Sequence, residues 1–364
     1  MRNRIAANEG ASTYIFCLCG ASLVGNVFAM LMSGRMGAFA GMSIANWVSY
    51  AIMQLAFIGV VFIMGVWRKF DPLKVARIRP SRNWKQYLLL PFIALFTILA
   101  FYPLSLLFMK FLSVIGYHGG GVAVPQFESV GVYFLAILVI AVLPAIGEEL
   151  MCRGILCSGL STRSVPFGIL ISAFLFSFMH ANPLQTVHQF GLGVVSAILF
   201  ILSGSLLPSI ILHFLNNFYT LTITAYIPEV DMLIYRLGNW NYLTGAVSVV
   251  VGLVGLAVLL YLYHRAGQKK KAPAFKVFEN SGVFDEYTII ATMDEEGKKT
   301  NVFLDTFRFV GSLFTKSGWQ EVRRVLTNSA DVPMIGNAQP MISVWIAIGF
   351  AAFYWVVNFV LGMI

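Results

Sequence analysis

Nine apolar stretches of membrane-spanning length recur along the chain. About 17–25 apolar residues suffice for one transmembrane helix, and such stretches lie near residues 13–32, 44–66, 87–114, 130–158, 166–182, 187–203, 206–226, 241–263 and 342–362. Only 11% of the residues are charged, where soluble domains carry about 25%, and the mean hydropathy is +0.79. We therefore expect an all-α polytopic membrane protein of about nine transmembrane helices.

Basic residues cluster in segments that we expect to face the cytoplasm. The segment from Trp67 to Gln86 has a net charge of +6, Arg2 and Arg4 precede the first stretch, and 269–271 is a run of three lysines. Because cytoplasmic loops are enriched in Lys and Arg, we predict a cytoplasmic N-terminus and an external loop at 116–129, which has neither residue. The net charge of +9 is then explained by orientation in a lipid bilayer, and nucleic acid is not an expected partner.

Five segments organise the chain in this interpretation. They are N-terminal spans with the basic loop (1–129), a core with polar motifs (130–226), an eighth span (227–263), a cytoplasmic module (264–341) and a C-terminal span (342–364). Within the module, β-branched and aromatic residues at 286–293 and 300–310 predict a β-hairpin, and Ser317 and Gln320 have capping-box spacing for a helix at about 318–327. We expect a small α+β insertion before the last span.

Four cysteines, Cys17, Cys19, Cys152 and Cys157, fall inside the expected spans. This placement predicts neither a disulfide framework nor a paired zinc motif, and we interpret the cysteines as small packing residues.

Three ionisable residues interrupt the apolar run from 130 to 160. Residues four apart on a helix share a face, so Glu149 and Arg153 are expected to pair, while Glu148 points elsewhere and remains free as a general base or metal ligand. Charges inside a bilayer usually face a polar cavity and carry function. The alternative is that the helix leaves the membrane near residue 148 and that all three charges are solvated.

Polar residues on two later stretches offer partners for Glu148. His180 ends one apolar stretch, and His213 and Asn217 lie four residues apart on one side of another, whereas Asn216 is expected to turn away. Burying an imidazole and an amide in hydrocarbon is costly without polar partners. We therefore expect Glu148, His180, His213 and Asn217 to assemble around one space below the membrane surface.

These residues form three motifs in order, Glu-Glu-x-x-x-Arg at 148–153, Phe-x-x-x-His at 176–180 and His-x-x-x-Asn at 213–217. Together they resemble the CPBP family of intramembrane proteases, also called Abi or CAAX-type prenyl endopeptidases, over about 130–226. The resemblance implies hydrolysis of peptide bonds in membrane-associated peptides or in prenylated, CAAX-like proteins. The divergent flanks are typical of the bacterial branch, in the plasma membrane.

The resemblance also implies individual roles. Glu148 would activate water with help from His180, and His213 and Asn217 would stabilise the oxyanion. The resemblance implies that three further residues surround this set without acting on the substrate, namely Glu149, Arg153 and Phe176.

Whether a metal takes part stays open at this point. The family is often described as metalloproteases, and Glu148, His180 and His213 are a donor set that suits zinc. The sequence has no His-Glu-x-x-His motif, however, and a metal-free, glutamate-activated water is equally compatible. His188 could add a ligand, although a hydrogen-bonded interfacial histidine is the simpler interpretation.

Two other classes of function remain as alternatives. A protein of the same fold could bind a peptide toxin and confer immunity without cleavage, although the intact motifs favour activity. A proton-coupled transporter would use Glu and His as a relay, but the polar residues cluster on three stretches and no inverted repeat is visible.

Overall fold

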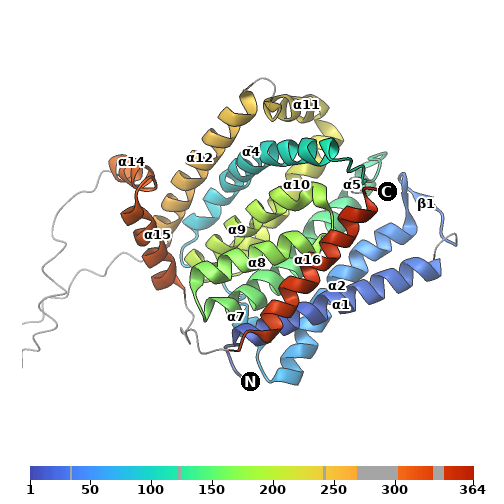
Figure 1. Cartoon of the computed structure of the whole chain (residues 1–364), viewed down its shortest axis with the longest axis horizontal. Coiled ribbons are helices and arrows are strands. Elements are labelled where there is room, and N and C mark those ends of the chain that lie inside the picture. Colours follow the sequence, from blue (N-terminus) through green and yellow to red (C-terminus); the bar gives the residue numbers. More distant parts are fainter. Residues whose placement is uncertain (33–34, 121–123, 241–242, 269–301, 331–339) are drawn as a thin grey trace, which may run out of the picture.

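The computed structural model describes residues 1–32, 35–120, 124–240, 243–268, 302–330 and 340–364, and it is a bundle of long helices (Figure 1). The elements are α1 (Ala7–Met32), β1 (Ala38–Phe39), β2 (Met42–Ser43), α2 (Ile44–Arg68), α3 (Pro72–Val75), α4 (Lys85–Val114), α5 (Val130–Ala136), η1 (Ile137–Val142), α6 (Leu143–Glu149), η2 (Leu150–Cys157), α7 (Ser158–Ser161), α8 (Val165–Met179), η3 (Pro183–Gln185), α9 (Thr186–Ser203), α10 (Leu207–Tyr226), α11 (Pro228–Leu237), α12 (Thr244–Gly267), α14 (Val302–Ser312), α15 (Lys316–Ser329) and α16 (Ile342–Leu361).

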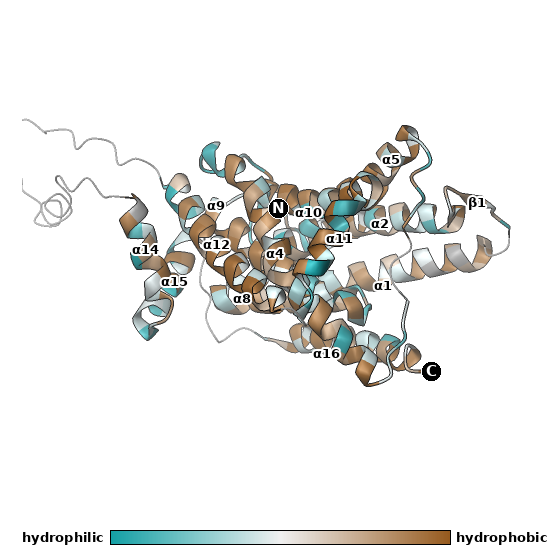
Figure 2. Ribbon diagram, turned by 90° about the horizontal axis from the view of Figure 1, so that it is seen from above, coloured by the Kyte–Doolittle hydropathy of each residue, from teal (hydrophilic) through white to brown (hydrophobic). Residues whose placement is uncertain are grey.

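Seven of the described helices are long and apolar enough to cross a membrane, or eight if the bent pair α10 and α11 counts as one span. The expected stretch at 166–182 is helical but short, because α8 has only 15 residues. The expected count of nine spans is therefore not reached by length and composition, although each predicted stretch contains a helix. Most residues of the long helices are apolar (Figure 2), and many of their large apolar side chains are exposed, as a lipid-facing protein requires.

The bundle has two distinct ends. At one end, which we call the basic end, the backbone N–H of Arg2 donates to Lys69, the N–H of Leu206 donates to Arg77, and the Nε of Arg79 donates to the carbonyl of Gly204. This end therefore gathers the N-terminus, the segment between α2 and α4, and the turn between α9 and α10.

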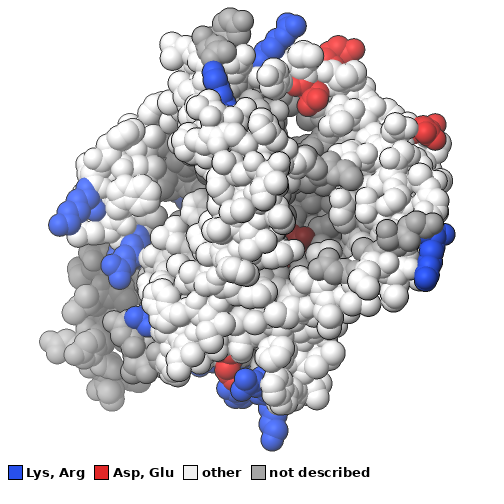
Figure 3. All heavy atoms as spheres, turned by 45° about the vertical axis from the view of Figure 1, so that its right-hand side comes forward, with Lys and Arg blue, Asp and Glu red and all other residues white. Residues whose placement is uncertain are grey.

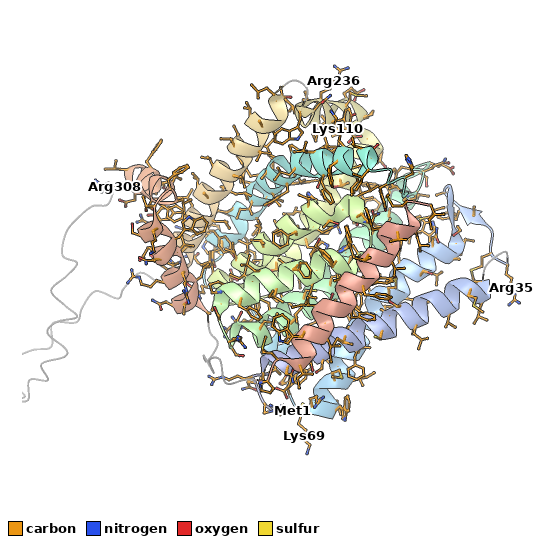
Figure 4. All side chains as sticks on the ribbon, viewed as in Figure 1. Met1, Arg35, Lys69, Lys110, Arg236 and Arg308 are labelled. Atoms are coloured by element: carbon orange, nitrogen blue, oxygen red, sulfur yellow. The ribbon has the colours of Figure 1, made fainter. Side chains whose placement is uncertain are left out.

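At the opposite end, the loop that follows α4 meets the other helix termini. The N–H of His118 donates to the carbonyl of Gly362, and the N–H of Gln126 donates to that of Ala40. Met1 and Lys69 lie together in Figure 4, whereas Arg35 lies far from both. The predicted cytoplasmic and external segments thus lie at different ends of the bundle.

The α8, α9 and α10 helices and the helix formed by 130–161 occupy the middle of the bundle (Figure 1). Every residue from Leu150 to Ser161 is buried. Cys17, Cys152 and Cys157 are buried, as expected of packing residues, whereas Cys19 is exposed and does not fit that expectation.

The segment 264–341, expected to be a cytoplasmic α+β module, differs from its prediction. The strand expected at 300–310 is wrong, because Val302–Ser312 forms α14, and its expected partner at 286–293 lies outside the described residues. Asp305 and Phe309, four residues apart, pair with α12 through Arg265 at 3.1 Å and a stacked Tyr261 at 4.8 Å. Both contacts join α14 to α12.

The helix expected at 318–327 is present as α15, but its N-cap differs from the prediction. The Thr315 side chain accepts from the N–H of Gly318, whereas Ser317 lies inside the helix.

We predict that a methyl group at Gly252 destabilises the bundle. A Cβ at this position would lie 2.5 Å from the backbone nitrogen of Ala100 in α4, and overpacking of a tight contact costs about 1–3 kcal/mol. Gly252→Ala should therefore lower the thermal unfolding temperature in detergent. Gly349→Ala is the matched control, because nothing lies within 4 Å of its Cβ; equal effects of the two substitutions would contradict the prediction.

Candidate active site

The helix that carries both glutamates is irregular on either side of them. Two π-helical segments, η1 and η2, flank α6, and Glu148 and Glu149 are its last two residues. Each π-helical turn holds more residues than an α-helical one, and such turns are frequent at functional sites. The sequence predicted a regular helix here, and periodicity alone gave no signal for the π segments.

Glu149 and Arg153 form the expected ion pair, with Glu149 Oε1 2.7 Å from Arg153 Nη1. Both side chains are completely buried, so the alternative that these charges are solvated is wrong. The same carboxylate oxygen lies 2.9 Å from Nδ1 of His213 on α10. The Phe176 ring lies beneath the guanidinium, with 4.1 Å from the Arg153 Cζ to the ring centroid. One buried pair thus connects three helices.

Glu148 faces the other way and keeps one oxygen uncommitted. Its Oε1 accepts a hydrogen bond from Gln54 Nε2 of α2 at 2.9 Å. Its Oε2 is buried and has no hydrogen-bond partner among the described residues. This oxygen lies 3.7 Å from His180 Nε2 and 4.0 Å from His213 Nε2, separations beyond a direct hydrogen bond that a bridging water can satisfy.

The backbone and Glu149 fix how both imidazoles are oriented. His180 Nδ1 lies 2.8 Å from the carbonyl oxygen of Phe176, and His213 Nδ1 lies 2.9 Å from a Glu149 oxygen. Since a carbonyl or carboxylate oxygen can only accept, each Nδ1 carries the hydrogen. In their neutral forms both rings therefore present a lone pair on Nε2 towards Glu148.

A cavity of about 730 Å³ contains this cluster, within the range of about 300–1,000 Å³ typical of ligand sites. Glu148 is the one acidic side chain among its described lining residues, and the lining includes no Lys or Arg. Its other polar lining residues include Gln54, His180, His188, His213, Asn216, Asn217 and Thr220. The four predicted catalytic residues therefore share one cavity.

Asn216 also lines this cavity, so the expectation that it turns away is wrong. The cavity is wide enough to receive residues at i, i+3 and i+4 of α10, which together form one broad helix face. Asn216 accepts a hydrogen bond from His188 Nε2 at 2.9 Å and donates to Asn217 Oδ1 at 3.2 Å. His188 is therefore a hydrogen-bonded histidine, as its simpler interpretation held.

Gln54 is a site residue that the sequence analysis missed. It lies within the expected span 44–66, and an amide in such a stretch is costly without a partner, which is the signal that could have identified it. Nothing in the sequence indicated that α2 would pack beside Glu148.

The spacing of Glu148, His180 and His213 is wider than that of the ligands of a zinc ion. Two ligands of a tetrahedral zinc ion lie about 3.3 Å apart, given metal–ligand bonds of about 2.0–2.1 Å, and the carboxylate oxygen lies 3.7 and 4.0 Å from the two Nε2 atoms. Within the described ranges, no group of three or more His, Cys, Asp or Glu side chains has the arrangement of a metal site. The reaction considered for this site is therefore assigned to water and to the side chains of the protein.

The helices that carry this site match a known protein family. Residues 130–219 match the family described as type II CAAX prenyl endopeptidase Rce1-like, and the match covers a quarter of the chain, with all three motifs inside it. Searches of curated proteins and of solved structures found no match. The resemblance to the CPBP family is confirmed: the chain carries an Rce1-like domain of the CAAX protease family. Together with its apolar helices, this makes it an integral membrane protein.

We predict that Arg153→Met costs about 3–5 kcal/mol in the free energy of unfolding, because it leaves the Glu149 charge buried without its ion-pair partner. Adding Glu149→Gln should recover part of that loss, since the uncompensated charge disappears. Equilibrium unfolding in mixed micelles measures both changes, and Arg35→Met, at an exposed arginine, is the control. If the two losses simply add, the ion pair does not stabilise the site.

Proposed function

We propose that this protein is an intramembrane endopeptidase that hydrolyses peptide bonds with a water activated by Glu148. The observation that carries the proposal is the buried, uncommitted Oε2 of Glu148, which faces two imidazole Nε2 atoms inside a cavity. The Rce1-like family of the surrounding helices supports the same reaction class.

In the first step of the proposed reaction, a water lies between Glu148 Oε2 and His180 Nε2. Glu148 removes one proton from this water while the lone pair of His180 Nε2 accepts the other hydrogen and orients the oxygen. The resulting hydroxide attacks the carbonyl carbon of the substrate. Gln54 holds Oε1 of Glu148, so that Oε2 is the oxygen directed at the water.

The tetrahedral intermediate then places negative charge on the substrate oxygen. His213 can donate to this oxygen from Nε2 when both ring nitrogens carry a hydrogen. Asn217 uses one hydrogen of Nδ2 on the carbonyl of Ile140, 3.1 Å away, and its second hydrogen is available to the oxyanion. When the C–N bond breaks, protonated Glu148 returns its proton to the leaving amine, which restores the carboxylate.

The proposed substrates are membrane-associated peptides or proteins, because the site lies along the middle of apolar helices. We also propose that the basic end is cytoplasmic, since it carries the clusters of Lys and Arg. In this proposed orientation, the N-terminus lies on the cytoplasmic side of the plasma membrane.

We predict that Glu148→Gln abolishes peptide cleavage by the purified protein, with a loss of at least about 10²-fold, while a chelator leaves the wild-type rate unchanged. Cleavage of candidate membrane peptides in detergent, read by mass spectrometry, measures both effects. Glu128→Gln is the control, because Glu128 is exposed. A Glu148→Gln protein that still cleaves the peptide would contradict the role of Glu148. One that loses cleavage but keeps its cellular phenotype would favour a binding or immunity role, and inhibition by the chelator would contradict the metal-free reaction.

Removing the second proposed oxyanion donor should affect the rate more than binding. We predict that Asn217→Ala lowers kcat by about 10²–10³-fold with a small change in KM, the effect typical of a lost oxyanion contact. Steady-state kinetics on a quenched peptide measures the two constants separately. A rise in KM alone would assign Asn217 to substrate binding.

A further inference from the structure

The described lining of the catalytic cavity extends from Glu148 towards one end of the bundle. On its lining, Tyr50 lies near the start of α2, Met109 near the end of α4, and Val124 in the loop before α5. All three belong to the opposite end, away from the basic end. Figure 3 is turned towards this end and shows a hollow with an acidic side chain at its floor, and Glu148 is the acidic residue that the described lining contains.

Close packing closes the other direction. Below Glu148, every residue from Leu150 to Ser161 is buried. Small residues bring the neighbouring helices against this segment: a Cβ at Gly154 would lie 2.7 Å from Ala76 Cβ, and one at Gly159 would lie 2.8 Å from the carbonyl oxygen of Ala6. No described lining residue of the cavity belongs to this segment. A peptide therefore has no open route to Glu148 from the basic end.

The α8 and α9 helices explain why the opposite end is hollow. They form a hairpin whose turn, at 180–185, lies beside the second half of α16, because Trp355 Nε1 donates to Thr186 Oγ1 at 2.8 Å. The hairpin therefore turns back before it reaches the end where α16 terminates. The space beyond its tip is the cavity, and His180 lies at that tip.

The chemistry of the cavity wall indicates what it accepts. From the mouth inwards, the wall carries aromatic and aliphatic side chains such as Tyr50, Tyr102 and Val139, and its described lining has no Lys or Arg. An apolar peptide segment suits this wall, because binding transfers the peptide's apolar side chains from water to an apolar surface. The described part of the wall carries no cation that would require a negative charge on the peptide.

We infer that substrates reach the site from the extracytoplasmic side, as apolar peptide segments in the outer leaflet or emerging from it. The inference combines the direction in which the cavity lining extends with the position of the basic clusters, which place the other end in the cytoplasm. It rests on the proposed protease function. It also implies that the lipid-modified C-terminus of a cytoplasmic protein, the substrate type named by the family, is not the substrate of this chain.

Orientation is tested first, by single added cysteines. Arg35→Cys lies at the opposite end and Lys69→Cys at the basic end, and neither residue lines the cavity. Intact cells are treated with a membrane-impermeant maleimide, with the unsubstituted protein as the background for its native thiols. We expect labelling of Arg35→Cys in intact cells and of Lys69→Cys only after permeabilisation. The reverse pattern overturns the inference, whether or not the protein is a protease.

Access is tested next, with right-side-out and inverted membrane vesicles. The probe is an apolar quenched-fluorescent peptide whose sulfonated dye keeps it from crossing the bilayer, and vesicles with Glu148→Gln protein give the blank. We expect cleavage in right-side-out vesicles and its loss in inverted ones. Cleavage only in inverted vesicles overturns the inference and leaves the protease intact. If purified wild type in detergent does not exceed Glu148→Gln on this peptide, the proposed function fails and the substrate inference fails with it.

Discussion

The buried ion pair between Glu149 and Arg153 is the interaction on which the site depends. Two charges removed from water cost several kcal/mol each, and their attraction offsets this only when the geometry is good and the remaining polar atoms find partners. Here one carboxylate oxygen also binds His213 and the guanidinium stacks on Phe176. The other carboxylate oxygen, and the Nε and Nη2 atoms of Arg153, have no hydrogen-bond partner among the described residues. The pair therefore fixes an imidazole on α10 and an aromatic ring on α8 relative to the helix that carries both glutamates.

Two adjacent and chemically identical side chains, Glu148 and Glu149, have different roles in the site. Within the described part of the chain, both carboxylates bond through Oε1 and leave Oε2 without a hydrogen-bond partner, but Glu149 binds a cation and an imidazole and does not line the cavity, whereas Glu148 binds Gln54 and does line it. The roughly 100° between successive helix residues is what allows neighbours to serve such different purposes. The close packing around Gly154 and Gly159 continues below the pair, so the cavity has a closed floor and the free carboxylate oxygen lies at its base.

Helical spacing accounts for the features that could be predicted from the sequence. The pairing of Glu149 with Arg153, and the shared face of His213 and Asn217, follow from residues four apart, and apolar length identified the helices. Contacts between segments that are distant in the sequence could not be predicted from helical spacing. Gln54 reaches Glu148 across 94 residues of chain, Asn216 joins the cavity because the cavity is broad, and α14 is helical because it packs on α12.

The central claim is that water held by Glu148 is the nucleophile in peptide hydrolysis. It is tested most directly by cleaving a membrane peptide with the purified protein in water enriched in oxygen-18 and weighing the products by mass spectrometry. The account predicts one heavy oxygen in the newly formed carboxylate of each wild-type product, and no product from Glu148→Gln. Cleavage without incorporation of the label, or labelled product from Glu148→Gln at the wild-type rate, would contradict it.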